Sequence, residues 1–180
     1  MSALGRPRTL RGALCGASAA AIWALTQPLD KLVFKSSYDD VELLGRALTA
    51  GERWYPVGLG IHLSNGAVFG ALYANLAPAV PVPPVLRGPT LALAEHLALW
   101  PLTTLSDWVH PARDRLPPLA GNRRAFGQAT WRHLLYGMVL GELERRLNAA
   151  PEAAPPEAEV VYSSNGRGSL EDATPARPTS

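Results

Sequence analysis

The sequence predicts an all-α membrane protein, in which four transmembrane helices form a bundle built from two tandem helical hairpins. Three observations predict this fold class. Apolar residues make up 47% of the chain and charged residues 18%, whereas soluble domains have about 25% charged residues. No charged residue lies between Arg11 and Asp30, or between Arg53 and Arg87. Small residues also recur at four-residue spacing, as they do where membrane helices approach closely.

The first helix is predicted over about residues 10–29, because a bilayer core about 30 Å thick requires roughly 20 apolar residues. Arg6, Arg8 and Arg11 lie before or at its start, as basic residues do in a signal peptide. The small-x-small pattern that begins at Ala17 resembles a signal-peptide cleavage site. The apolar run before Ala17 is too short for a signal peptide, however, and the hydrophobic stretch continues to Leu29. We therefore expect this helix to be retained.

Three further spans are predicted from hydropathy, over about 54–76, 89–108 and 125–147. The fourth span has the weakest signal, because Arg132 lies inside it. Together with the first helix these spans form one transmembrane domain over 1–148, with the lipid bilayer as its partner.

Two other segments differ in character from the spans. A short amphipathic helix is predicted over about 38–49, because Asp39 and Asp40 suit a helix N-terminus. Aromatic residues follow it at the start of the second span, so we expect this helix to lie at the membrane interface. The Pro-, Glu- and Ser-rich tail over 149–180 has no apolar periodicity and is expected to be disordered.

Small-residue pairs predict which helix faces pack together, because lipid provides no hydrophobic force between helices. The pairs are Gly12 and Gly16, Gly66 and Gly70, and Gly137 and Gly141, with Ala94 and Ala98 in the third helix. Other membrane proteins, or a second copy of the chain, are candidate partners for these faces.

The two halves of the sequence resemble each other in order and spacing. Trp23-Ala24-Leu25-Thr26 with Asp30 matches Trp100-Pro101-Leu102-Thr103 with Asp107, and His62, Gly66 and Gly70 match His133, Gly137 and Gly141. This internal repeat predicts two hairpins that start on the same side of the membrane, related by an axis along the membrane normal.

Ionisable and amide groups inside the predicted spans form the candidate functional site, because such groups are costly in lipid and tend to face the bundle interior. The polar path candidates are His62, Asn65, Glu95, His96, Arg132 and His133; the rim candidates are Asp30, Asp107 and His110. Glu95 and Arg132 have no polar counterpart in the other half, so we expect them to form a buried ion pair. A structural alternative is that the whole set only binds helices together.

Motifs of soluble enzymes are absent from the sequence: there is no phosphate-binding glycine loop, no Gly-x-Ser-x-Gly and no His-Glu-x-x-His. The histidines lack local metal-ligand spacing, and the single Cys15 excludes a cysteine-based zinc site. The net charge is +2, with no basic cluster interleaved with aromatic residues. The sequence thus predicts no cofactor, no metal, no catalytic residue and no nucleic-acid partner.

The pattern resembles that of small polytopic membrane proteins of GC-rich bacteria, in general character rather than in a diagnostic motif, and the resemblance implies no residue roles. We expect a non-catalytic integral membrane protein that serves as a scaffold or assembly component. The alternative is a small transporter, or a protein that binds a proton, an ion or a lipid headgroup through the polar path. Basic residues before the first helix favour a cytoplasmic N-terminus, although the summed loop charges favour the opposite orientation.

Overall fold

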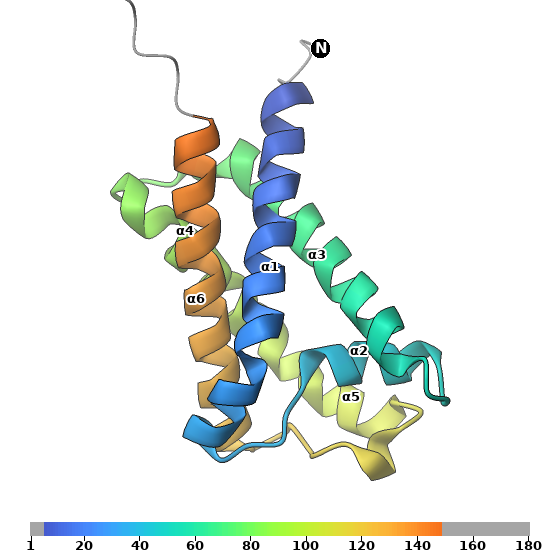
Figure 1. Ribbon diagram of the computed structural model, residues 1–180. Coiled ribbons are helices and arrows are strands. Elements are labelled where there is room, and N and C mark those ends of the chain that lie inside the picture. The colour runs from blue at the N-terminus through green and yellow to red at the C-terminus, as the bar shows by residue number, and fades with distance from the viewer. Residues whose placement is uncertain (1–5, 149–180) are drawn as a thin grey trace, which may run out of the picture. The chain divides into compact units, whose positions relative to one another are not determined.

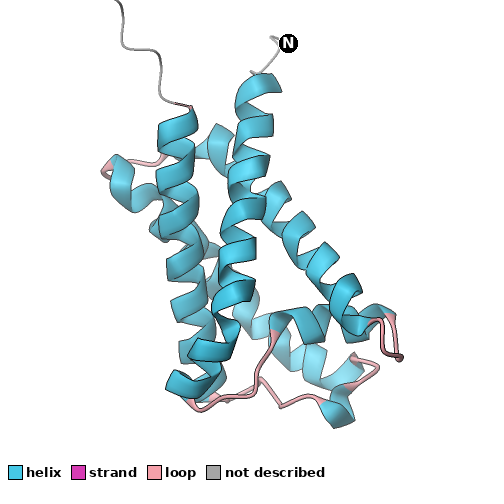
Figure 2. Ribbon diagram, in the orientation of Figure 1, coloured by secondary structure: helices cyan, strands magenta, loops and turns pink. Residues whose placement is uncertain are grey.

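The computed structural model describes residues 6–148, which form six α-helices and three short 3₁₀ turns (Figure 1). The helices are α1 (Arg6–Phe34), α2 (Asp40–Leu48), α3 (Trp54–Leu76), α4 (Pro84–Leu99), α5 (Thr103–Val109) and α6 (Arg123–Leu147). Figure 2 shows helices and loops throughout this described part, without a strand. The predicted all-α class is therefore confirmed, and the predicted tail over 149–180 lies outside the described residues.

The long helices pack in two pairs that meet in the middle of the domain. Helix α1 packs on α3, α6 packs on α4, and α1 and α6 lie side by side and antiparallel (Figure 1). Helix α2 packs on α3 within the first half. Each half thus has two longer helices with a short one between them, whereas a short helix was predicted only in the first half. The superposition of Trp23 on Trp100 and of His62 on His133 stays a prediction.

Glycines hold each pair of long helices at backbone contact. A Cβ atom added to Gly16 of α1 would lie 2.0 Å from the carbonyl oxygen of Gly66 in α3. In the other pair, a Cβ atom added to Gly88 of α4 would lie 2.0 Å from the carbonyl oxygen of Gly137 in α6. These glycine faces are therefore occupied within the chain, and a partner would have to pack on other surfaces.

The third predicted span differs most from the structure. Its predicted contact residues, Ala94 and Ala98, are exposed, and Gly88 and Ala92 are buried in their place. The helix begins earlier than predicted, at Pro84, because proline is tolerated in a first helical turn. It leaves α-helical geometry after Leu99, where Pro101 has no N–H for the helical hydrogen bonds and a 3₁₀ turn leads into α5.

The other predicted helices are found close to their predicted bounds. The helix predicted over 54–76 corresponds to α3 and that over 125–147 to α6. The short helix predicted over 38–49 corresponds to α2, whose N-cap Asp39 accepts a hydrogen bond from the Glu42 N–H. The first helix continues past Pro28 to Phe34. It ends where Lys35 takes a left-handed conformation (φ 51°) and the Ser36 N–H donates to the Lys31 carbonyl, a Schellman-type helix end.

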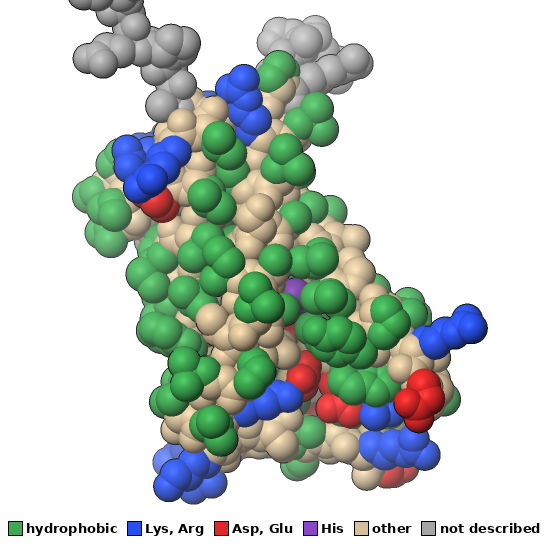
Figure 3. All heavy atoms as spheres, in the orientation of Figure 1, with side chains coloured by type: hydrophobic (Ala, Val, Ile, Leu, Met, Phe, Trp, Pro, Cys, Tyr) green, Lys and Arg blue, Asp and Glu red, His purple; other side chains and the backbone are tan. Residues whose placement is uncertain are grey.

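Large apolar side chains of the described helices point outward, and small or polar side chains fill the interior. Leu25 and Trp108 are 80% and 81% exposed. By contrast, the core between α1, α3, α4 and α6 is rich in alanine and glycine, with Trp23, Tyr73 and Tyr136 as its larger members. On the face shown in Figure 3, charged side chains gather toward the two ends of the long helices, with a green and tan band between them.

One described helical segment, Trp54–Ala79, is long and apolar enough by itself to cross a membrane. Helix α4 has 16 residues, and α1 and α6 do not meet the same criterion of length and hydropathy. Length and hydropathy thus support one span, and the four-span bundle stays a prediction.

Candidate functional site

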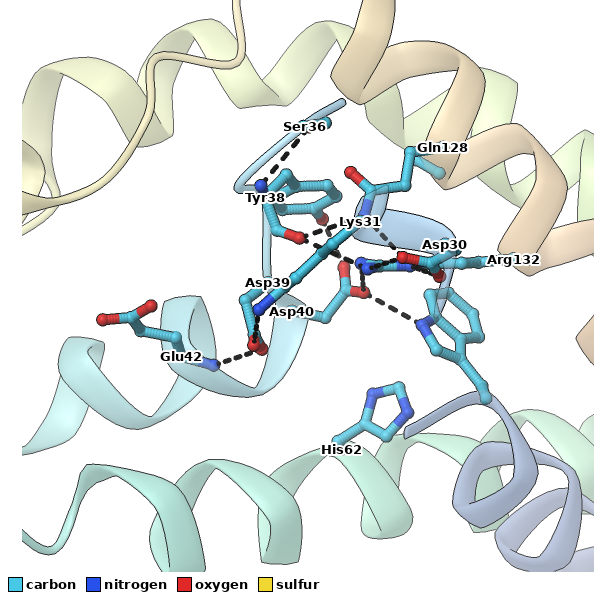
Figure 4. A network of polar contacts seen from close by, with 12 residues as sticks. Asp30, Lys31, Ser36, Tyr38, Asp39, Asp40, Glu42, His62, Gln128 and Arg132 are labelled. Carbon is cyan, nitrogen blue, oxygen red and sulfur yellow. Dashed lines mark hydrogen bonds and ion pairs between the residues drawn. The ribbon is translucent and has the colours of Figure 1, made fainter. Parts of the chain in front are cut away.

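Arg132 of α6 lies at the centre of a buried ion network and is fully buried (Figure 4). Its Nε donates to Asp30 Oδ2 at 2.5 Å, and one terminal nitrogen donates to Asp30 Oδ1 at 2.6 Å. The other terminal nitrogen donates to Asp40 Oδ2 at 2.7 Å. The Tyr38 carbonyl accepts a further bond at 3.2 Å. All three guanidinium nitrogens are therefore engaged, and they join α1, the segment before α2, α2 itself and α6.

The two carboxylates of this network receive further donors. The Gln128 amide donates to Asp30 at 2.6 Å, the Trp23 indole donates to Asp40 at 3.0 Å, and the Tyr38 hydroxyl also donates to Asp40. Burial raises the pKa of Asp40, but the charge of Arg132 and the Tyr38 hydrogen bond outweigh it, so the pKa lies below its ordinary value. Burial and the charge of Asp40 raise the pKa of Tyr38, which stays a neutral donor.

The predicted ion pair between Glu95 and Arg132 is wrong. Glu95 of α4 contacts His133, with Oε2 and Nε2 3.1 Å apart, while Arg132 turns to Asp30 and Asp40. The reason lies in helix geometry, because successive residues point about 100° apart around a helix. Arg132 faces α1 and α2, and its neighbour His133 faces α4.

An open pocket of about 320 Å³ lies beside the ion network. Four of the six polar path candidates line it: His62, Asn65, Glu95 and His133. Trp23, Asp40 and Tyr136 complete its polar and aromatic wall, and Asp40 therefore belongs to both the pocket and the network. The Asn65 side chain from α3 and the Glu95 side chain from α4, which is 36% exposed, lie toward the outside.

Hydrogen bonds to carbonyl oxygens fix the tautomers of two pocket histidines. His62 Nε2 donates to the Ala20 carbonyl at 3.1 Å, which leaves Nδ1 of the neutral ring as an acceptor. His133 Nδ1 donates to the Ala129 carbonyl at 2.7 Å, so Nε2 of its neutral ring would face Glu95 as a second acceptor. Nδ1 of His62 is therefore available to accept a hydrogen bond, and Glu95 and His133 form one polar contact on the pocket wall.

His96 lies behind this wall rather than in it. Its Nε2 is 3.0 Å from the Thr130 hydroxyl, and its ring lies 4.5 Å from the ring of His133, measured between centroids. His96 thus supports the orientation of His133.

The three rim candidates have different positions. Asp30 is buried rather than at a rim, because it packs against α6 and accepts hydrogen bonds from Gln128 and Arg132. Asp107 accepts hydrogen bonds from the Leu119 and Ala120 N–H groups, and His110 Nε2 donates to the Leu43 carbonyl at 2.9 Å. Asp107 and His110 therefore hold the connection before α6 in place.

Sequence reasoning missed Asp40 and Trp23 as site residues. Both lie next to features that it did identify, since Asp40 follows the N-cap and Trp23 belongs to the repeat. A helix N-terminus needs one acidic cap, and Asp39 supplies it. The second acidic residue, Asp40, was therefore available to pair with Arg132.

Within residues 6–148, no group of three or more His, Cys, Asp or Glu side chains is arranged to hold a metal ion. In comparisons with protein families, with curated proteins and with solved structures, no match to this chain was found.

Proposed function

We propose that the chain is a multi-pass integral membrane protein that binds an amphiphilic amine in the pocket between α3 and α4. Helices α1, α3 and α6 would cross the bilayer as single helices. Helix α4 would cross together with the 3₁₀ turn and α5 that continue it to Val109. The observation that carries this proposal is a pocket lined by two acids, Asp40 and Glu95, and by no lysine or arginine, inside a bundle with many exposed apolar side chains.

The direction in which side chains point supports the membrane assignment. In a soluble bundle, each helix turns its large apolar residues inward and a charged face outward. Here Leu25 of α1, Val68 of α3, Leu97 of α4 and Met138 of α6 are all exposed. The interior instead holds Arg132 and its acidic partners. Lipid as the surrounding solvent accounts for both features, because it favours outward apolar groups and inward polar ones.

The charges around the pocket favour a positively charged ligand. Asp30 and Asp40 together carry two negative charges, and Arg132 balances one of them. Glu95 is a further acidic side chain of the pocket wall and contacts His133. One negative charge next to the pocket is therefore unbalanced, and an unbalanced buried charge is costly.

The pocket wall also has the groups that recognise an ammonium. The rings of Trp23 and Tyr136 lie 6.1 Å apart, between centroids, and both line the pocket, so their faces can attract a cation. The free Nδ1 of His62 is an acceptor for an N–H donor. The alkyl chain of the ligand would leave past Leu99, an exposed residue of the pocket wall.

A scaffold function is the second candidate, and the saturation of Arg132 favours it. Each nitrogen of this side chain already has a partner within the chain, so the network needs no ligand. On this account the network joins α1, α2 and α6, and the protein acts through its outer surfaces.

Thermal unfolding in a neutral maltoside detergent, with added decylammonium, decyltrimethylammonium or decyl sulfate, distinguishes the two candidates. Decylammonium should raise the melting temperature saturably, decyltrimethylammonium less because it has no N–H donor, and decyl sulfate not at all. His62→Phe keeps a ring beside Trp23 and should weaken decylammonium binding about tenfold. Glu142→Gln changes an exposed acid outside the pocket and is the matched control. Equal shifts for all three additives, or for all variants, would favour the scaffold.

A further inference from the structure

A second pocket, of about 190 Å³, lies where α1 and α4 begin and α3 and α6 end. Its wall includes Arg8 of α1, Arg87 of α4 and Arg145 of α6, together with Tyr73 of α3 and Glu144 of α6. Glu144 lies about 16 Å further along α6 than His133 of the first pocket. The two pockets therefore belong to different levels of the bundle.

Charge and free donors in this pocket point to an anion. Of its three arginines, Arg8 pairs with Glu144 at 3.1 Å and Arg145 pairs with Glu142 at 2.9 Å. Arg87 has no acidic partner among the described residues. Arg87 uses its Nε for the Val82 carbonyl, and its terminal nitrogens make no hydrogen bond to any described residue. The guanidinium fork of such a side chain matches the oxygens of a phosphate group.

Two donors in the same wall lack partners. Tyr73 is 97% buried, as its 3% exposure shows, and its hydroxyl makes no hydrogen bond within the described part of the chain. This hydroxyl lies next to Gly141, another wall residue, because a Cβ atom added there would be 3.3 Å from it. The Nε of Arg8 is also buried without a partner among residues 6–148. An unpartnered buried donor such as the Arg8 Nε is costly, and a bound acceptor would remove that cost.

We propose that this pocket binds a phosphate group, held by Arg8, Arg87 and the Tyr73 hydroxyl. The volume admits a phosphate with a short ester substituent. Two sources share this chemistry: a free phosphate, or the headgroup of an anionic phospholipid. The position at the helix ends, where Val85 and Leu86 are exposed, suits a lipid headgroup as well as a dissolved ion. This site rests on its own contacts and not on the amine pocket.

Two titrations of the full chain distinguish the sources. The first adds inorganic phosphate to protein in maltoside detergent, against potassium chloride of equal ionic strength, and measures the melting temperature. The second places the protein in nanodiscs of phosphatidylcholine with or without phosphatidic acid and records retained lipids by native mass spectrometry. A saturable shift in the first assigns the site to free phosphate. Retention of phosphatidic acid over phosphatidylcholine in the second assigns it to a lipid headgroup.

Variants of the wall test the geometry. Arg87→Gln should lower the affinity for the bound phosphate about tenfold, because it removes a charged donor. Tyr73→Phe keeps the packed ring and should lower it about threefold. Arg146→Gln, an exposed arginine at the same helix end but outside the wall, is the matched control and should change nothing. The proposal is overturned if neither titration shows saturable binding, or if Arg146→Gln weakens binding as much as Arg87→Gln.

Discussion

The Arg132 network and the amine pocket lie side by side, share Asp40, and differ in how completely their polar groups are satisfied. Every nitrogen of Arg132 has a partner inside the chain, and the side chain is fully buried. His62 keeps a free ring nitrogen at the pocket, and Glu95 is 36% exposed at its outer side. A charge inside a predicted membrane span therefore does not by itself mark a functional site. A polar side chain whose hydrogen-bonding groups all have partners within the chain indicates a structural role. A polar side chain with an unused group at a pocket is available to a ligand.

The largest effect should come from opening the closed network. Arg132→Met leaves Asp30 and Asp40 buried without their cation, and we expect a loss of about 3–5 kcal/mol in the free energy of unfolding. Reversible unfolding in mixed micelles measures this loss. Arg146→Met, which removes an exposed arginine, is the control and should have no comparable effect. Similar losses for both variants would show that the network is not structural.

A smaller loss should come from the glycine contact that brings α1 and α3 together. Gly70→Ala places a Cβ atom 2.2 Å from the Gly12 carbonyl oxygen, so the helices must separate. We expect a loss of about 1–3 kcal/mol in the free energy of unfolding. Gly60→Ala lies on the same helix with no atom within 4 Å of the added Cβ, and it should be neutral or slightly stabilising. Equal losses of stability for Gly70→Ala and Gly60→Ala would show that the contact between Gly12 and Gly70 does not hold α1 and α3 together.

These contacts also show what sequence could predict about the fold. Uncharged stretches identified most of α1 and α3, and hydropathy identified α6. Glycine spacing identified the contact faces of α1, α3 and α6, since all these signals are local. The break after Leu99 was missed because Trp100 and Pro101 continue an apolar run, and hydropathy alone does not register a proline that lacks its N–H.

The sequence predicted part of the candidate site and missed the partner of Arg132. Polar groups in the predicted spans were expected to face the bundle interior, and His62, Glu95 and His133 do line one pocket. The partner of Arg132 could not be found from that expectation, because it depends on how the chain folds back between Phe34 and Asp40. That turn places Asp40 against α6, and no periodic signal in the sequence describes it.

A still smaller change in stability should follow a change in the open pocket. Glu95→Gln keeps the shape of the side chain and its contact with His133, so the free energy of unfolding should change by less than about 1 kcal/mol. The same variant should weaken decylammonium binding, because it removes a carboxyl group from the pocket wall. A stability loss as large as that of Arg132→Met would mean that Glu95 has a structural role like that of Arg132.

The smallest expected effect is the loss of stability in acid that protonation of Asp40 causes. Because the pKa of Asp40 lies below its ordinary value of 3.8 in the folded protein, its contribution to stability is present above that pH and is lost as the pH falls below it. Melting temperatures of the wild type should therefore decline more steeply below pH 3.8 than those of Asp40→Asn. Parallel acid profiles for the two proteins would show that Asp40 carries no such contribution.

The whole account depends on lipid contacting the apolar middle of the bundle, and cysteine accessibility in intact membrane vesicles tests this most directly. In a Cys15→Ala background, single cysteines replace Leu25, Val68, Leu97 and Met138 in the middle, and Arg124 and Arg146 at the two ends of α6. An impermeant maleimide should leave the four middle positions unlabelled until detergent is added. The two end positions should react from opposite sides of the membrane. Labelling of the middle positions in intact vesicles, or of both ends from one side, would contradict the account.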